Sequence, residues 1–378
     1  MSVSFIITSY NIDPYIEKCL ESVAASARSG DEIIVVDDGS KDRTVDMVRS
    51  FMDRADLPEG VDLVPVFLGA NTFGGVGIAA NIGLDHASRD TVFFVDGDDW
   101  LNPASFNSCR AVFDQRDVDF LMVNYLEYDE LLDEMRPPAD QGRWRLLDAG
   151  FTPQERRDFA LSMIAVPWRK FYRRDFLKAH NLRFPEGDFF FEDNPFHWAV
   201  CRAAERFSFY DQVICYHRIN RPGQTMASTG AELMAFFTHY DLITADLPAD
   251  DPALKVAAMR WLVNNMSWHM TRLQPAVYHA YGQAAAARIR AFDESLWNDH
   301  ILTGFARSPM IDALVHLRAG DLAGFVSGAK MDMLQRQLEA VQQQLLEQAE
   351  AGADTRARID RLRAVQEFDA LTRRADRY

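Results

Sequence analysis

The sequence is poor in cysteine and has no long apolar run, and both absences exclude classes of protein. Its 378 residues include four cysteines and no CxxC pair. We therefore expect reduced thiols packed in apolar segments, as in a cytoplasmic protein, rather than a disulfide framework. No stretch reaches the length of about 18 apolar residues that a membrane-spanning helix needs. The first residues, MSVSFIITSYN, are too short and too uncharged for a signal peptide and predict a strand instead.

A net positive charge is also lacking. The chain has 40 Lys and Arg residues against 56 Asp and Glu residues, which gives a formal net charge of -16. Nucleic acids and anionic lipid surfaces need a cationic partner, so binding of either kind is not expected. The hydrophobic fraction of 48% is that of a globular protein, and the length allows two compact domains or one domain with an extension. The acidity fits an enzyme that holds an anionic substrate through a metal ion and a few local donors.

The first half of the chain alternates apolar strands with amphipathic helices. Strands are expected at 3–8, 32–36, 61–68, 91–95 and 120–125, and helices at 14–25, 44–52 and 78–86. Asp13 is placed to cap the first helix, ahead of Pro14. Apolar strands separated by helices indicate a mostly parallel, Rossmann-like sheet that is covered on both faces. In such sheets ligands bind beyond the carboxyl ends of the strands.

Polar clusters follow three of these strands. They are TSYN at 8–11, DDGS at 37–40 and DGDD at 96–99. Polar loops at strand ends are common, so a single cluster would carry little weight. Three clusters at successive strand ends predict one shared crevice.

The acidic turn holds three carboxylates, Asp96, Asp98 and Asp99, within four residues. Without partners they would repel one another and raise some of their pKa values. A divalent cation such as Mg²⁺ or Mn²⁺ relieves this repulsion, and it can also stabilise a diphosphate leaving group. The alternative is a solvated turn whose aspartates cap the helix near Pro103. From the turn alone both interpretations stay open.

Two further acidic pairs have a structural and a functional interpretation. Asp37 and Asp38 could accept hydrogen bonds from a base or a ribose, but a tight turn with a helix cap is the better explanation of that pair alone. Glu192 and Asp193 lie in FFFEDNPFHW, where aromatic surroundings would raise a carboxyl pKa and favour a general base. The same residues also make a good helix start, and the two roles are compatible.

Six motifs occur in one order along the chain. They are TSYN, VVDDGSKDRT, NTFGGVGIAANIGL, VDGDDW, WRKFYRRDFL and FPEGDFFFEDNPF. This ordered set resembles the family 2 glycosyltransferases with the GT-A fold, notably bacterial capsule, lipopolysaccharide and cell-wall enzymes. The resemblance covers about residues 1–225. It implies an inverting enzyme that transfers a sugar from a nucleoside-diphosphate sugar, such as a UDP-sugar, to a hydroxyl group.

The resemblance also implies a nucleoside pocket. Thr8 and Tyr10 would line it, with Tyr10 stacking on uracil. Asp38 would bind the uracil imide, Asp37 would serve the ribose or the sheet end, and Asn81 would lie on the donor side. The family pattern has an Arg directly before this Asn, whereas this chain has Ala80. Either a neighbour such as Arg218 replaces that Arg, or the nucleotide differs.

The remaining implied roles concern the diphosphate, the metal and the chemistry. Asp96 and Asp98 would form a DxD motif that holds Mg²⁺ or Mn²⁺, with Asp98 reaching the metal. Asp193 would be the base that deprotonates the acceptor hydroxyl, through an oxocarbenium-like transition state. The other implied donor contacts are Asp99 and Lys170 at the sugar or diphosphate, and His217, Arg218, Gln224 and Thr225 in a segment that closes over the diphosphate.

The implied product belongs to surface polysaccharide or glycoconjugate synthesis. The sugar would be a hexose or an N-acetylhexosamine, and the acceptor a saccharide or a lipid-linked molecule. The expected location is cytoplasmic, with or without peripheral association with the inner membrane. Two alternatives are a sugar-nucleotide-binding scaffold of weak activity that acts through its tail, and a nucleotidyltransferase. The second is disfavoured because SYNIDPY, which follows the first strand, has no glycine and no basic cluster.

The C-terminal part differs in character. Residues 231–330 predict an all-helical region, and 331–378 a tail rich in Gln, Glu and Arg. Leu334, Leu338, Val341 and Leu345 step by four, three and four, which is coiled-coil spacing. The tail would either form a homo-oligomer or fold back on its own chain. The predicted domains are therefore 1–230, a GT-A glycosyltransferase domain, then 231–330 and 331–378.

Overall fold

The computed structural model describes residues 1–54, 57–224 and 229–375, with the backbone alone described for 350–360 and 362–375. The chain divides into two compact units. Unit 1 comprises Met1–His269 and Phe292–Thr303, and unit 2 comprises Met270–Ala291 and the residues from Gly304 on. The domain boundaries expected after residues 230 and 330 stay predictions.

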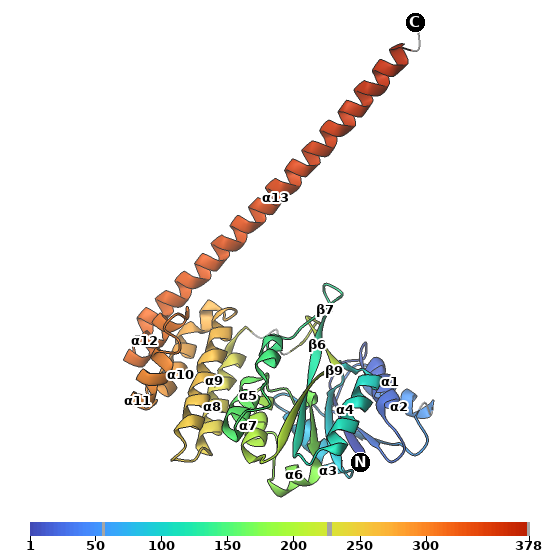
Figure 1. Ribbon diagram of the computed structural model, residues 1–378, viewed down its shortest axis with the longest axis vertical. Helices are drawn as coiled ribbons and strands as arrows, with labels where there is room; N and C mark the ends of the chain where they lie inside the picture. The colour runs from blue at the N-terminus through green and yellow to red at the C-terminus, as the bar shows by residue number, and fades with distance from the viewer. Residues whose placement is uncertain (55–56, 225–228, 376–378) are drawn as a thin grey trace. The chain divides into compact units, whose positions relative to one another are not determined.

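A nine-stranded sheet forms the centre of unit 1 (Figure 1). Its first half is the parallel array β3-β2-β1-β4. These strands are β1 (Val3–Ser9), β2 (Glu32–Asp37), β3 (Asp62–Phe67) and β4 (Thr91–Asp96). The register sets Ser9 beside Asp37 and Thr8 beside Asp96. The three polar clusters therefore meet at one edge, as the sequence predicts.

The second half of the sheet is mixed. It continues from β4 in the order β8-β6-β9-β5, and β7 pairs with β6. Only β6 and β9 are parallel in this half. The mostly parallel arrangement expected from the sequence thus holds for the first four strands. The strands of this half are β5 (Trp100–Leu101), β6 (Phe120–Asp129), β7 (Glu134–Arg136), β8 (Lys170–Arg173) and β9 (Phe207–Ile219).

Seven helices of unit 1 lie between these strands or follow them. They are α1 (Ile16–Ser26), α2 (Thr44–Asp53), α3 (Gly77–His86), α4 (Pro103–Gln115), α5 (Pro153–Ser162), α6 (Arg174–Ala179) and α7 (Asp193–Ala203). The capping prediction for Asp13 is wrong, because α1 begins after Tyr15 without a side-chain cap. Asn102 caps α4 by accepting a hydrogen bond from the Ser105 backbone N–H. The acidic turn therefore does not serve as that cap.

Both faces of the sheet carry an aromatic core. Successive strand residues point to opposite faces, and Phe93 and Phe94 of β4 do so. The Phe93 ring packs against Phe106 of α4 at a centroid distance of 4.9 Å. The Phe94 ring packs against Phe196 of α7 at 5.9 Å. The sheet is therefore covered on both sides, as expected, and all four cysteines are buried and free.

The C-terminal region is helical, as predicted. Unit 1 also contains α8 (Ala235–Ala245), α9 (Pro252–Met270) up to His269, and the short α11 (Glu294–Leu296). Unit 2 contains α10 (Tyr278–Ile289), α12 (Ile311–Ala319) and α13 (Leu322–Ala375). The 54 residues of α13 form one helix that passes through 351–354 without a break. Across the described residues, no helix is long and apolar enough to cross a membrane.

Candidate active site

The loops after β1, β2 and β3 are bound to one another at the carboxyl edge of the sheet. The Asp37 carboxylate accepts hydrogen bonds from the Ser9 hydroxyl at 2.9 Å and from the Ser40 backbone N–H at 2.9 Å. Asp38 accepts two from Thr72, from its backbone N–H and its hydroxyl, both at 2.9 Å. Burial raises the pKa of Asp38 despite these bonds. Asp37 therefore holds its own turn, and Asp38 anchors the loop after β3.

Tyr10 is the exposed member of this wall. Its side chain is 43% exposed, whereas Thr8 beside it is buried. The next residue, Asn11, has a left-handed φ of 49° and accepts a hydrogen bond from the Lys41 backbone N–H at 2.7 Å. The backbone beside Tyr10 is thus held by a hydrogen bond, while the Tyr10 ring is exposed to solvent.

The acidic turn is folded tightly against β1. The Gly97 backbone N–H donates to the Thr8 carbonyl at 2.9 Å. A Cβ at position 97 would lie 2.5 Å from Cδ1 of Ile12 and 2.8 Å from that carbonyl oxygen. Only glycine fits this approach, so the turn from Asp96 to Asp99 can pack closely on β1.

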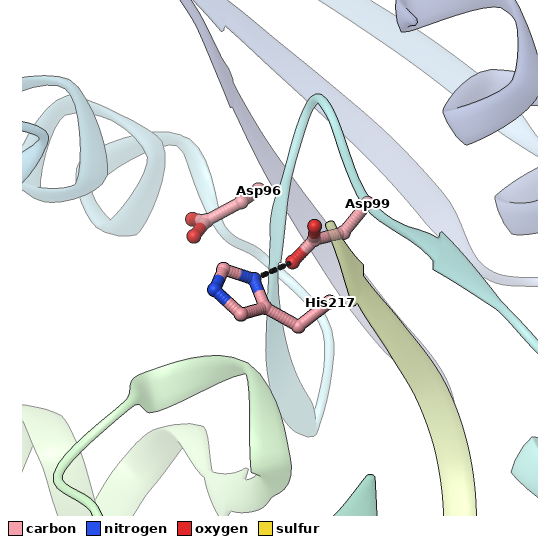
Figure 2. A group of neighbouring side chains, drawn as sticks. All are labelled: Asp96, Asp99 and His217. Carbon is pink, nitrogen blue, oxygen red and sulfur yellow. Dashed lines mark hydrogen bonds and ion pairs between the residues drawn. The ribbon is translucent and has the colours of Figure 1, made fainter. Parts of the chain in front are cut away.

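Three side chains converge beside the turn, and Figure 2 shows them. Asp96, Asp99 and His217 each offer one ligand atom, and these atoms all lie within 4.8 Å of one another. The Asp99 carboxylate lies 2.9 Å from Nδ1 of His217. The imidazole also stacks on the Trp168 ring at a centroid distance of 4.9 Å. We call these three residues the acidic cluster.

The electrostatics of the acidic cluster are those of crowded carboxylates. Burial, followed by the charges of Asp99 and Asp98, raises the pKa of Asp96 well above its usual range. Burial also raises the pKa of Asp99, against the opposing effect of His217. Burial alone would lower the pKa of His217, but the carboxylates, Asp99 first, raise it to about 9. At neutral pH the imidazolium therefore acts as a counter-ion for the cluster.

The donor set of the acidic cluster fits a divalent cation. It combines two carboxylates with one imidazole, and carboxylate oxygens are the ligands that Mg²⁺ and Mn²⁺ favour. The raised pKa values of Asp96 and Asp99 show that their ionised forms are disfavoured, and a nearby positive charge would stabilise those forms. A bound cation would supply that charge in place of the proton on His217.

The sequence analysis assigns the metal to Asp96 and Asp98, whereas the structure groups Asp96 with Asp99 and His217. Asp98 instead forms an ion pair with the guanidinium group of Arg221. The carbonyl oxygen of Asp98 accepts a hydrogen bond from Nε of Arg218 at 3.1 Å.

Arg218 is held on several sides. Its backbone N–H donates to Asp99 at 2.8 Å, and its guanidinium pairs with Glu130 at 2.7 Å. Its carbonyl accepts a hydrogen bond from the Gln224 side chain at 2.6 Å. Arg218 therefore ties the end of β9 to the acidic turn. Thr225, the other residue expected in this segment, lies outside the described residues.

Asp193 begins α7 on the opposite face of the sheet from α4. Burial raises the pKa of Asp193, while Lys170 and the Asn194 amide oppose this effect. Asn194 donates to its carboxylate at 3.0 Å. Asp193 in turn raises the pKa of Asp96, so the two carboxylates are electrostatically coupled. The charge of the predicted base is therefore felt at Asp96 of the acidic cluster.

The segment before Asp193 is joined to the glycine-rich loop. Glu192 is buried and accepts a hydrogen bond from the Gly77 backbone N–H at 2.6 Å. Gly74 has a φ of +85°, and a Cβ there would lie 2.2 Å from the Gly187 carbonyl oxygen. Phe191 has a left-handed φ of 66°, which is strained for an aromatic residue. The two loops are therefore one packed unit that fixes where α7 and its first carboxylate begin.

Two residues that are predicted to contact the donor, Lys170 and Asn81, form hydrogen bonds within the protein. Lys170 is fully buried, and its ammonium group donates to the Val166 carbonyl at 2.7 Å. Burial lowers its pKa to about 7. Asn81 is also buried, and its amide exchanges hydrogen bonds with the backbone of Phe184 at 2.9 and 3.0 Å. Asn81 thus supports the segment that leads to Asp193, and Lys170 supports the turn before β8. Contact of either residue with a donor stays a prediction.

Sequence reasoning missed Arg221 as part of the site, the place of His217 in the acidic cluster, and the bond of Glu192 to the glycine-rich loop. The signal for Glu192 is its position next to Asp193. Arg221 and His217 flank the end of β9, a strand that the sequence pattern does not reveal. Their carboxylate partners lie 123 and 118 residues earlier in the chain.

Known proteins resemble this chain in sequence and in fold. Residues 4–180 match the family model described as Glycosyl transferase family 2. The uncharacterized glycosyltransferase EpsJ of Bacillus subtilis is 29% identical over 254 residues, covering 64% of this chain and 72% of EpsJ. The poly(ribitol-phosphate) beta-N-acetylglucosaminyltransferase TarS of Staphylococcus aureus is 26% identical over 249 residues, covering 65% of this chain but 40% of TarS.

Solved structures resemble the fold at low sequence identity. The crystal structure of TarS residues 1–349 in complex with UDP-GlcNAc has a TM-score of 0.70 at 23% identity, covering 89% of this chain and 92% of that one. The mannosyltransferase PcManGT from Pyrobaculum calidifontis, in complex with GDP-Man and Mn²⁺, has a TM-score of 0.51 at 18% identity, covering 88% and 86%. These similarities establish a glycosyltransferase fold of the GT-A type. By this similarity, residues 4–180 form a domain of the glycosyl transferase family 2 type.

Proposed function

We propose that this protein transfers a sugar from a nucleoside-diphosphate sugar, probed first as a UDP-sugar, to a hydroxyl group with inversion at the anomeric carbon. The observation that carries the proposal is the acidic cluster, together with the electrostatic influence of Asp193 on its Asp96. The acidic cluster would hold the diphosphate through a cation, and Asp193 would accept the proton of the attacking hydroxyl. A sugar transfer by single displacement needs both functions.

The nucleoside would bind at the wall formed by the loops after β1, β2 and β3. Tyr10 offers an exposed ring for stacking, and Asp38 offers a carboxylate held in place by Thr72. The relatives support a nucleotide sugar, because TarS was crystallised with UDP-GlcNAc and PcManGT with GDP-Man. With Ala80 in place of the family's Arg, Tyr10 and Asp38 would carry most of the base recognition.

The acidic cluster would hold Mg²⁺ or Mn²⁺. When bound, such an ion withdraws charge from the diphosphate and makes it a better leaving group. Asp96, Asp99 and His217 supply the donor atoms, and the Mn²⁺ in the PcManGT complex supports this role for a related fold. Arg221 would move from Asp98 to the diphosphate, because a phosphate offers the guanidinium group a stronger bidentate partner.

Asp193 would act as the general base. Its raised pKa makes the carboxylate a stronger proton acceptor than an exposed aspartate at the same pH. Lys170 opposes that shift and so keeps the carboxylate ionised before the reaction. The acceptor would be a hydroxyl group of a saccharide or of a lipid-linked intermediate, and the sugar a hexose or an N-acetylhexosamine.

A ligand screen tests the proposal. A ligand that binds the folded state raises the apparent melting temperature, so either UDP and its sugars or GDP and its sugars should do so in the presence of Mn²⁺. The rise should disappear with a chelator, and the effective nucleotide should identify the donor for a hydrolysis assay. If none of these nucleotides stabilises the protein and none of the sugars is turned over, the proposal fails.

A further inference from the structure

The long helix α13 carries apolar side chains that no other described part of the chain covers. Met331, Leu334, Leu338, Val341 and Leu345 are 67%, 54%, 52%, 53% and 59% exposed. They occupy successive a and d positions of a heptad repeat that begins at Met331. Five large apolar side chains on one stripe form a surface that soluble proteins normally cover. We call these five residues the α13 stripe.

The opposite side of α13 faces its own unit. Phe325 and Ala329 are buried, and a Cβ on Gly282 of α10 would lie 2.7 Å from the Phe325 ring. Further along, Arg336 donates to the Met270 carbonyl at 2.9 Å. Ala329 and Arg336 both take position f of the same heptad, which lies on the side of the helix away from a and d. The contacts that anchor α13 to unit 2 therefore leave the α13 stripe free.

This arrangement disfavours the interpretation in which the tail folds back on its own chain through its apolar face. Figure 1 shows α13 continuing well past α10 and α12, the helices of unit 2 that pack on its first turns. Because α13 is unbroken through 351–354, the heptad phase is kept, and in sequence positions 359 (Ile) and 362 (Leu) fall at a and d again. The a and d positions between Leu345 and residue 359, namely 348, 352 and 355, are Gln, Gly and Thr, so the continuous apolar stripe ends at Leu345.

The residues beside the α13 stripe indicate what covers it. Positions e and g between 331 and 345 are Gln335, Gln337, Gln342 and Gln344. Charged e and g positions select an oppositely charged partner and would repel an identical helix. Glutamine carries no charge and both donates and accepts hydrogen bonds, so it is compatible with a copy of itself. A heptad stripe also requires a partner of similar length, and among the described helices the next longest is α9 with 19 residues.

We propose that α13 pairs with α13 of a second copy of this protein, through the α13 stripe. The interface is a coiled coil in which a and d side chains of the two helices interlock. None of the five residues of the α13 stripe belongs to the acidic cluster. The association is therefore a property of the tail and does not depend on the bound donor.

The test is the mass of the full-length protein in solution, measured by light scattering after size exclusion over about 1–100 µM. The expected result is an oligomer of wild type that dissociates in Leu338→Asp/Val341→Asp, with association weakened at least about a hundred-fold by the buried charges. The matched control is Gln343→Asp/Glu347→Gln on the outer face of the same turns, which should stay oligomeric. Near-UV circular dichroism, which reports the packing of the aromatic core of unit 1, should be unchanged in all three proteins, which separates lost pairing from lost folding. A monomeric wild type across this range, or stripe variants that remain oligomeric, would overturn the proposal.

Discussion

The carboxylate of Glu192 accepts a hydrogen bond from the backbone N–H of Gly77 at 2.6 Å, across 115 residues of chain. The bond joins the glycine-rich loop before α3 to the first turn of α7, where Asp193 begins. A Cβ at Gly75 or Gly77 would approach the Glu192 side chain to 2.6 or 2.8 Å, so the glycines are needed for the fit. The position of the proposed base is thus set by a buried acid that does no chemistry itself.

The first prediction concerns the pH dependence of stability. Burial raises the pKa of Glu192 from 4.5 to about 7, so the folded state keeps this proton when the unfolded state has lost it. The contribution of this group to the free energy of unfolding therefore falls by on the order of 3 kcal/mol as the pH rises from 4.5 to about 7. Above that pH the contribution is constant.

Glu192→Gln removes this titration. Its free energy of unfolding should exceed that of wild type at pH 8 and approach it at pH 5, as measured by urea denaturation. Glu59→Gln, at an exposed position, is the matched control and should follow wild type at every pH. A Glu192→Gln protein whose difference from wild type does not change with pH would contradict the assignment.

The second prediction distinguishes two metal-binding sets. His217→Ala should weaken Mn²⁺ binding by at least roughly 10–100-fold, because it removes one of the three donors of the acidic cluster. Asp98→Asn should change Mn²⁺ affinity less, since Asp98 is paired with Arg221. Binding can be measured by the paramagnetic resonance signal of free Mn²⁺ without donor, with the exposed His180→Ala as the control. The reverse order of effects would favour the DxD pair that the sequence suggests.

The third prediction tests the base. Asp193→Asn should lower kcat for transfer by about 10²–10⁴-fold, while the affinity for the nucleotide with Mn²⁺ stays close to that of wild type. Transfer is followed by release of nucleoside diphosphate, and affinity by calorimetry. Asp188→Asn, five residues earlier and exposed, should retain normal transfer. Near-normal turnover of Asp193→Asn would remove this residue from the role of base.

The fourth prediction concerns the acidic turn. Gly97→Ala places a methyl group 2.5 Å from Ile12 and 2.8 Å from the Thr8 carbonyl, so the turn must shift away from β1. We expect a loss of about 1–3 kcal/mol in the free energy of unfolding, together with weaker Mn²⁺ binding. Gly69→Ala is the control, because a Cβ there meets nothing within 4 Å. Unchanged Mn²⁺ affinity in Gly97→Ala would show that the turn tolerates displacement.

Much of unit 1 follows from local sequence patterns. The first four strands and their helices are predicted because apolar runs and helical spacing are properties of short segments. Asp96 and Asp193 can be picked out as candidate site residues from the sequence, because Asp96 ends a strand and Asp193 begins a helix. The strands β8 and β9 are not, because their segments lack the alternation of strand and helix, and their pairing is decided by residues far away in the chain.

The metal set shows a second limit of the sequence. Asp98 and Asp99 are neighbours of the same type, and the sequence cannot tell which faces the cluster. That choice depends on the turn at Gly97 and on β9, which brings His217 to Asp99 and Arg221 to Asp98. Asp37 and Asp38 pose the same problem, since one carboxylate bonds within its own turn and the other to the next loop.

The pairing of β9 with β6 and β5 also fixes the order in which the site can assemble. The acidic turn is synthesised more than a hundred residues before the two cationic side chains that neutralise it. A nascent chain that ends before β9 therefore carries an acidic turn with neither the imidazole of the cluster nor the guanidinium group beside it. The acidic cluster is therefore complete only when β9 has joined the sheet, late in the synthesis of unit 1.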